Sequence, residues 1–497
     1  MKKSKLSAFF SVCLIGLLLI SFQGAVYAQK HPSELRKPDP IKMPPPVAET
    51  FEVGQGIKVY FLEDNELPLV NLSAYFKGGS LSDPGDKIGL ASLMATVMRS
   101  GGTAKMSGDE IDEELSFLPA PLGVGAGDEI FSASFQCLKR HLPRVLEIFK
   151  EIVTSPAFVQ EKLDLARDQW KERMKTRWDS PNTAKTIIFN ELLVGYEAER
   201  MANPRTLNNI TRKDLVELHQ KYFVPNNMSI VIGGDISASE AKKELNRVFK
   251  DWQPRKVTFL PLPKLEDKSR PKVYYAYKDI PQAQILLGHY VDITRDHPDM
   301  EKIGILSTVL GGGLSSRLNE EIRVKRGWTY GISGYVGAAR ANGSFRIDSA
   351  LKAESLGEAL IIIKNIVKGM QTELITDEEL ERTKDSRIYG SVFQYNNPLN
   401  IVAGQVLRKI QGRSPFDDSK RLEKIRAVTK EDVLEMAKKY IHLDKMMMVI
   451  IGDKKKFDKP LEEFGEVVEL SLDELKKKDL AENGKKEETK ETIKKDN

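Results

Sequence analysis

Residues 211–235 read Thr-Arg-Lys-Asp-Leu-Val-Glu-Leu-His-Gln-Lys-Tyr-Phe-Val-Pro-Asn-Asn-Met-Ser-Ile-Val-Ile-Gly-Gly-Asp, and this stretch decides the fold. The pattern predicts a helix followed by an apolar strand that stops at a Gly-Gly-Asp turn. The same order returns 218 residues later, in residues 429–453, without a gap (429 − 211 = 218). At that offset Tyr222 falls on Tyr440. A repeat this long predicts two homologous domains, because solenoid repeats have periods of about 20–50 residues.

The repeat and the segments around it set the expected domain boundaries. A stretch rich in proline and charge separates the two copies, which is typical of a linker, and the end of the chain is rich in lysine and acidic residues. We expect a signal peptide at 1–28, a proline-rich lead at 29–46, a first domain at 47–251, a linker at 252–271, a second domain at 272–465 and a charged tail at 466–497. Beyond Glu474 the tail has almost nothing apolar to bury, so frayed helix or disorder is expected there.

Apolar patterning predicts further elements in the first domain. We expect strands at 59–62, 70–76 and 130–135, and helices at 88–98, 142–153, 161–177 and 214–222. This alternation of helices and strands does not by itself fix the strand order.

Composition excludes several classes of protein. Hydrophobic residues make up 41% of the 497 residues and charged residues 30%, which is typical of a globular chain with large cores. The 76 basic residues nearly balance the 71 acidic ones, so no nucleic-acid partner is expected. With two cysteines the chain cannot build a disulfide framework.

The amino terminus has the layout of a secretory signal. Three lysines precede an apolar run from Leu6 to Phe22, and small residues lead to an expected cleavage after Ala28. The alternative is an uncleaved membrane anchor, because the run is long for a signal. We predict a periplasmic or exported protein, with membrane attachment only if the signal is not cleaved.

Several stretches resemble the insulinase and mitochondrial-processing-peptidase (pitrilysin-like) family of zinc peptidases. They are residues 89–98 followed by Gly-Gly-Thr at 101–103, residues 210–215 and 222–228, and residues 311–318 and 321–330. The resemblance covers roughly Val53 to Gly465. It implies an α+β fold in which each domain is an antiparallel-rich sheet of about six strands with helices packed on one face.

The residues that hold zinc in active members of the family are missing. Those members carry His-x-x-Glu-His on the first core helix, where two histidines one turn apart bind zinc and the glutamate activates water. The matching positions here are Ser92, Ala95 and Thr96. Glu172 lies near the place of the family's third ligand, but a lone carboxylate is not a catalytic zinc site. We predict no metal in this chain.

The second domain keeps the other half of the family's machinery. An Arg and a Tyr separated by six residues bind substrate and stabilise the tetrahedral intermediate there, and Arg323 and Tyr330 have that spacing. A guanidinium holds a backbone carbonyl and a phenol donates to a developing oxyanion. The alternative is an ion-paired surface arginine and a packed tyrosine.

This combination resembles the family's two-chain bacterial enzymes. The resemblance implies a heterodimer in which a homologous partner subunit carries the zinc motif and its zinc, while this chain supplies Arg and Tyr. Unfolded peptide substrate joins a sheet edge as an added strand. That edge corresponds to Gly123, Val124, Gly125 and Ala126, whose glycines permit close backbone approach, although an ordinary glycine-rich strand would look the same.

Two other functions fit the residues. The chain could be a non-catalytic structural or peptide-binding scaffold, as other members of the family are, or an independently active peptidase with unusual ligands. The retained Arg–Tyr spacing favours the heterodimeric peptidase over the scaffold, because packing alone does not require it.

Overall fold

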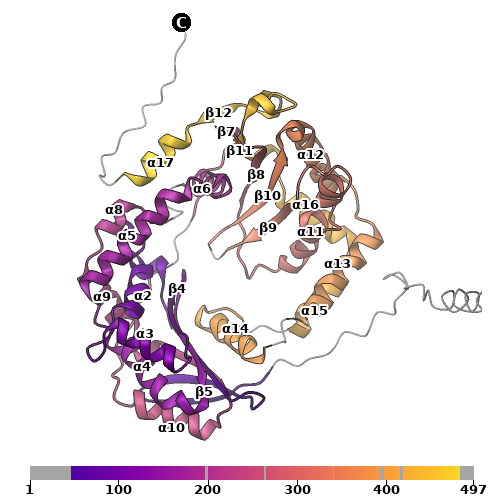
Figure 1. Ribbon diagram of the computed structural model, residues 1–497. Coiled ribbons are helices and arrows are strands. Elements are labelled where there is room, and N and C mark those ends of the chain that lie inside the picture. Colours follow the sequence, from indigo (N-terminus) through magenta and orange to yellow (C-terminus); the bar gives the residue numbers. More distant parts are fainter. Residues whose placement is uncertain are drawn as a thin grey trace, which may run out of the picture. The chain divides into compact units, whose positions relative to one another are not determined.

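The computed structural model describes residues 46–195, 200–261, 265–339, 341–391, 393, 397–414 and 418–481 (Figure 1). The expected signal, nearly all of the proline-rich lead and the last sixteen residues lie outside this set. Within the described residues, no helix is both long enough and apolar enough to cross a membrane.

A mixed sheet organises the first half of the chain, residues 46–251. Its order is β1-β2-β6-β3-β5-β4, and all neighbours are antiparallel except β2 and β6. The strands are β1 (Glu49–Val53), β2 (Ile57–Glu63), β3 (Leu69–Lys77), β4 (Leu122–Ala126), β5 (Ile130–Leu138) and β6 (Met228–Gly234). Along β3, residues 70, 72, 74 and 76 are buried and the residues between them are half-buried, so one face of the sheet meets a core.

Helices from the same half pack on that buried face. They are α2 (Leu90–Ser100), α3 (Gly108–Phe117), α4 (Leu142–Thr154), α5 (Gln160–Arg177), α8 (Pro204–Asn208), α9 (Arg212–Tyr222) and α10 (Ala238–Phe249). Together with the strands they form one continuous apolar core. Cys137 on β5 lies in this core, and burial raises the pKa of its thiol to about 12, so it is a packed structural thiol.

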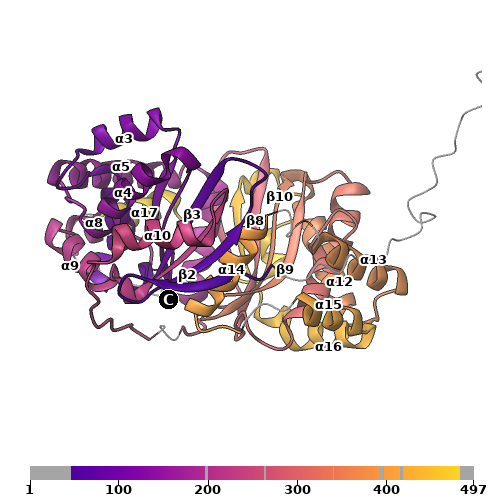
Figure 2. The same cartoon turned by 90° about the horizontal axis from the view of Figure 1, so that it is seen from below.

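The second half, residues 272–481, repeats the arrangement. Its sheet order is β12-β7-β11-β8-β10-β9, and the parallel pairs are β7 with β11 and β7 with β12. The strands are β7 (Val273–Tyr277), β8 (Gln282–Val291), β9 (Ile332–Ala338), β10 (Gly343–Lys352), β11 (Met447–Gly452) and β12 (Val467–Leu470). The helices are α11 (Met300–Gly311), α12 (Leu356–Thr372), α13 (Asp377–Gly390), α15 (Asp418–Ala427) and α16 (Lys430–Tyr440), several of them grouped beside β9 and β10 in Figure 2. The predicted pair of antiparallel-rich, six-stranded α+β sheets is confirmed.

Equivalent contacts recur in both halves. The helix in residues 211–235 begins with a capping box between Thr211 and Asp214, and its repeat begins with the same box between Thr429 and Asp432. Each capping aspartate also forms an ion pair with a lysine Nζ at 2.6 Å, from Lys87 in the first half and from Lys302 in the second.

Each half covers the second face of the other half's sheet with one helix. Helix α6 (Pro181–Val194) packs its apolar side on β8 and β11 (Figure 1), while α14 (Pro398–Ile410) packs on β2, β3 and β6. The expectation of helices on one face therefore describes each half alone. Lys185 of α6 is only 1% exposed, and its Nζ lies 2.9 Å from Asp348 on β10.

The residues after 465 differ from the expected charged tail. Strand β12 completes the second sheet, and α17 (Leu472–Leu480) follows it and packs on α5. The cause is local, because apolar residues recur in 467–475 and join the core under α6. Asp479 is buried, and it accepts hydrogen bonds from Arg177 and from the Trp178 indole at 2.7 Å.

Candidate functional site

Helix α2 carries the positions that match the missing zinc motif. Ser92 is half-buried, Ala95 is buried and Thr96 is exposed. The Thr96 hydroxyl donates 2.9 Å to the Ser92 carbonyl within the same helix. None of these side chains supplies an imidazole or a carboxylate, so the first core helix does not fit a zinc ion.

A buried carboxylate holds the start of α2. Asp83 is 3% exposed, and its two oxygens accept the backbone N–H groups of Gly89 and Ala91, each at 2.9 Å. These are among the orphan donors that a helix start leaves unpaired. Burial raises the pKa of Asp83 to about 6, although the two N–H donors and Arg200 act in the opposite direction.

This pKa predicts a pH dependence of stability that Asp83→Asn removes. The folded value of about 6 exceeds the ordinary 3.8, so the folded state binds the extra proton between these values. The unfolding free energy of the wild type, minus that of Asp83→Asn, should therefore fall by about 2 kcal/mol as pH rises from 4 to 6, and by roughly 3 kcal/mol over the whole titration from about pH 3 to 7. Urea titrations at stepped pH measure it. Buried His219 and His289, with pKa values lowered by burial to about 4, cancel in the difference. A difference that rises with pH would mean that the N–H donors outweigh burial.

Strand β4 leaves backbone groups open at the edge of the first sheet. The Leu122 carbonyl points to the edge, where the Arg99 Nε donates to it at 2.9 Å. Antiparallel strands alternate between paired and outward residues, so Val124 and Ala126 also point outward. The N–H and C=O groups of both residues have no hydrogen-bond partner in the part of the chain that the structure describes.

The matching edge in the second sheet is partly occupied by side chains. On β9, the Asn319 amide donates 2.6 Å to the Ile332 carbonyl, and the Ser307 hydroxyl accepts from the Val336 N–H at 3.1 Å. Helix α11 also lies against this strand, where a Cβ on Gly311 would stand 2.1 Å from the Gly334 nitrogen. Side chains therefore engage outward backbone groups of Ile332 and Val336 on β9, whereas none engages those of Val124 and Ala126 on β4 among the described residues.

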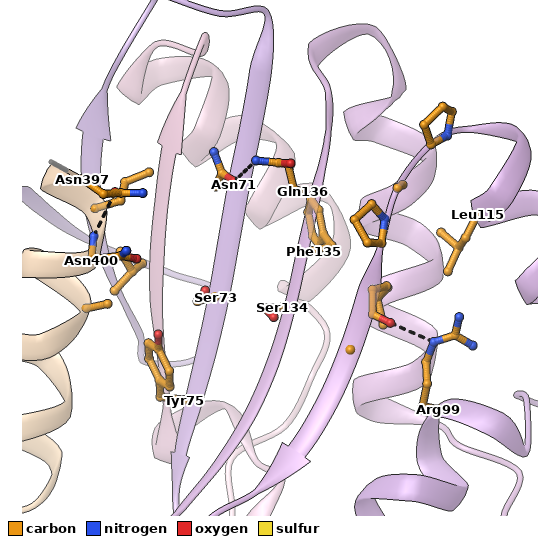
Figure 3. A pocket seen from close by; sticks show the side chains of 18 of the residues that line it. Asn71, Ser73, Tyr75, Arg99, Leu115, Ser134, Phe135, Gln136, Asn397 and Asn400 are labelled. Atoms are coloured by element: carbon orange, nitrogen blue, oxygen red, sulfur yellow. Dashed lines mark hydrogen bonds between the residues drawn. The ribbon is translucent and has the colours of Figure 1, made fainter. Parts of the chain in front are cut away.

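A cavity of about 880 Å³ adjoins the amino-terminal end of β4 (Figure 3). Its floor is the face of the sheet opposite the helix core, with Ser73 and Ser134 next to each other on β3 and β5. Gln136 donates 2.7 Å to Asn71 on the same floor. The start of α14, including Asn400, forms another wall, so both halves of the chain contribute to the cavity.

The structure places Arg323 and Tyr330 in the second half, and neither of them lines this cavity. Arg323 lies on a π-helical turn, Asn319–Val324, and Tyr330 lies in the loop before β9 with 89% of its surface exposed. The side chain of Arg323 makes no ion pair or hydrogen bond with another described residue. The predicted arginine is therefore not the ion-paired surface residue of the alternative interpretation, and the tyrosine is not packed.

No group of three or more potential metal-ligating side chains comes together among the residues that the structure describes. Glu172, the residue near the family's third ligand position, is an exposed residue of α5 and pairs with Lys175 at 2.7 Å. It is a solvated helix residue.

Sequence reasoning named the β4 edge but missed the side chains that engage the two edges, which are Arg99, Ser307 and Asn319. Asn319 lies within the quoted stretches around 311–330, but nothing in the residue pattern shows that its amide closes a strand edge. The signal that did mark the β4 edge is its pair of glycines. A Cβ on Gly123 would meet nothing within 4 Å, so the fold itself does not require glycine there.

Comparison with known protein families matches the chain to a family of peptidases. The family model described as insulinase (peptidase family M16) matches residues 58–203, and the model described as peptidase M16 inactive domain matches residues 209–387. The chain belongs to the insulinase family, M16, and it contains the inactive domain of that family.

Individual relatives agree with this assignment. A protein of Helicobacter pylori named non-peptidase homolog YmxG is 26% identical over 415 residues, covering 82% of this chain and 94% of its own length. An uncharacterized zinc protease of Rickettsia bellii is 24% identical over 350 residues, covering 68% and 82%. The crystal structure of a peptidase M16 inactive domain from Pseudomonas fluorescens has the same fold, with a TM-score of 0.71, 24% identity and coverage of 82% of this chain and 98% of that one.

Proposed function

We propose that the chain is the zinc-free subunit of a periplasmic, heterodimeric M16 metallopeptidase. A homologous partner with an intact His-x-x-Glu-His motif holds zinc and the catalytic base, and this chain binds unfolded peptide and completes the site. The degenerate positions Ser92, Ala95 and Thr96 support the zinc-free part of the proposal, as does the name of the Helicobacter pylori relative.

Arg323 and Tyr330 are the residues that this chain would present to the partner's site. Hydrogen bonds fix the backbone of the loop between them. The Trp328 N–H donates 3.1 Å to the Ile322 carbonyl, and the buried Thr329 hydroxyl lies 3.0 Å from that of Ser349. An exposed phenol and an unpaired guanidinium on a fixed backbone suit binding and charge stabilisation, since neither has to leave an internal partner first.

The open β4 edge carries the peptide-binding part of the proposal. An extended peptide that lies along β4 can exchange hydrogen bonds with the outward N–H and C=O groups of Val124 and Ala126. Such bonds recognise the backbone rather than the side chains, which suits a protein that takes unfolded chains of many sequences.

Val124→Pro tests this directly. Proline removes the outward N–H and is tolerated at a free edge, so the fold should persist while the ladder with the peptide is broken. We expect affinity for fluorescein-labelled casein, an unfolded protein, to fall at least about tenfold, which corresponds to about 1.4 kcal/mol. Val124→Ala keeps the N–H and should bind within about twofold of the wild type. Equal binding by the proline variant would remove β4 from the proposal.

The scaffold remains the second candidate, and the name non-peptidase homolog of the Helicobacter pylori protein favours it. A scaffold would bind peptide at β4 without stimulating any zinc-bearing chain. Co-purification from the native host separates the two candidates, because only the heterodimer requires a partner chain with an intact His-x-x-Glu-His motif.

The periplasmic location rests on the apolar run and the small residues before Gln29. Mass spectrometry of the mature chain should show an amino terminus at Gln29 in the periplasmic fraction. An intact Met1 in the membrane fraction would instead support the uncleaved anchor.

A further inference from the structure

We infer that the cavity beside β4 is a specificity pocket for a large, uncharged side chain of the bound peptide. The inference rests on the proposed strand addition at β4 and names the class of peptide that the edge selects. It follows from which residues share a face of the sheet, from the chemistry of the lining and from the register that Arg99 imposes.

The register of the sheet directs one set of peptide side chains toward the cavity. Gly123 pairs with Ser134 and Gly125 with Ser132, so these residues share the face opposite the helix core. A peptide residue that lies beside Gly123 projects its side chain to the same face. Because glycine has no side chain, nothing on β4 separates that peptide side chain from the floor at Ser134.

The lining offers hydrogen bonds but no unpaired charge. Among the described residues that line the cavity, the only charged ones are Arg99 and Asp112, and they pair with each other at 2.6 Å. The hydroxyl groups of Ser73, Tyr75 and Ser134 have no hydrogen-bond partner among the described residues. A tyrosine or glutamine side chain could use these groups, whereas a lysine or glutamate would lose hydration without meeting an opposite charge.

Arg99 limits where the added strand can pair. Its Nε already donates a hydrogen bond to the outward Leu122 carbonyl, and its ion pair with Asp112 holds the guanidinium there. Regular pairing along β4 is therefore confined to Val124 and Ala126, and the peptide residue beside Gly123 lies at the end of the ladder, where the cavity begins. Arg99 therefore acts as a positioning residue: it fixes which peptide residue lies beside Gly123, and the cavity selects the side chain of that residue.

The size of the cavity suits a large side chain. About 880 Å³ lies at the upper end of the range typical of small-molecule pockets, and Asn397 and Asn400 at the start of α14 line its far side. Small side chains would leave the floor hydrated, so they gain little from the cavity.

Guest-position peptides test the inference. The probes are fluorescein-labelled, extended octapeptides of serine and alanine in which a single residue is Tyr, Gln, Ala, Lys or Glu, measured by fluorescence anisotropy. At the selected position we expect Tyr and Gln to bind at least about fivefold more tightly than Ala, and Lys and Glu no more tightly than Ala. Ser134→Trp fills the floor at an exposed position, so it should abolish the Tyr and Gln preference while the Ala peptide binds within about twofold. Ser134→Asp should make Lys the preferred guest.

The outcomes separate this inference from the proposed function. Binding that Val124→Pro abolishes, but that does not discriminate among the guests, would overturn the pocket and leave strand addition intact. Tightest wild-type binding of Lys or Glu would also overturn it, as would an equal loss of Ala and Tyr peptides in Ser134→Trp. If Val124→Pro does not weaken the binding of any peptide, the proposed strand addition is wrong, and the inferred pocket is wrong with it.

Discussion

Arg323→Ala should lower the peptidase rate of the proposed heterodimer by at least about a hundredfold. In the proposed site the guanidinium holds the substrate carbonyl beside the phenol that donates to the developing oxyanion, and loss of one such donor typically lowers kcat by roughly 10²–10³. Tyr330→Phe, which removes only a hydroxyl, should act on kcat by a similar factor and leave KM nearly unchanged. Steady-state hydrolysis of an internally quenched peptide, with the partner chain at saturating concentration, measures both variants.

A neighbouring arginine provides the matched control. Arg326 lies three residues further along, pairs with Glu321 at 2.6 Å and sits over the Trp328 ring. Arg326→Ala should keep kcat within about threefold of the wild type. Because Arg323 has no described partner within the chain, its replacement should not change thermal stability. Normal turnover by Arg323→Ala would exclude this residue from the site.

Asp348→Ala should destabilise the fold more than any surface substitution. The Lys185 ammonium is 1% exposed, and removal of its acidic partner leaves a buried charge. Breaking such pairs costs about 3–5 kcal/mol, and because Asp348 itself is partly hydrated we expect roughly 2–3 kcal/mol in urea titrations at pH 7. The Lys185 ammonium also lies 3.3–3.4 Å from the Ser349 carbonyl and Gln284, which soften the loss.

Replacement of the lysine instead of the aspartate should destabilise the fold far less. Lys185→Met fills the same space without a charge and leaves a carboxylate that water can reach, so we expect a change below about 1 kcal/mol. Burial lowers the pKa of Lys185, and without Asp348 that pKa falls further. The destabilisation by Asp348→Ala should therefore shrink as pH rises toward the ordinary lysine value of 10.5, where the unfolded chain also loses the proton. A larger loss from Lys185→Met than from Asp348→Ala would contradict this account.

The repeated segments could be predicted because their signals are local. Residues 211–235 contain a capping box, an amphipathic helix and an apolar strand in direct succession, and the same signals recur at 429–453. The glycines at 123 and 125 also mark β4 without any tertiary information. The position of β4 at a sheet edge was implied only by resemblance to the family, and the structure places it there.

Long-range features could not be predicted in this way. Helices α6 and α14 each pack on the sheet of the other half, so the apolar faces that meet lie roughly 100 to 350 residues apart in the sequence. The apolar stripe of each helix would suit packing within its own half equally well. The hydrogen bonds that Ser307 and Asn319 make to the edge of β9 come from side chains that look like ordinary polar residues in the sequence. The high charge of the final segment obscured the apolar residues of Val467–Leu470, because composition describes the whole stretch while strand formation depends on a few residues.

Zinc content and proteolysis, measured together on the isolated chain and on its mixture with the co-purified partner, test the central claim most directly. We predict less than about 0.1 zinc per purified chain and no hydrolysis of labelled casein by it, with cleavage appearing only in the mixture and zinc remaining with the partner. One zinc per isolated chain, together with casein hydrolysis by that chain alone, would contradict the account.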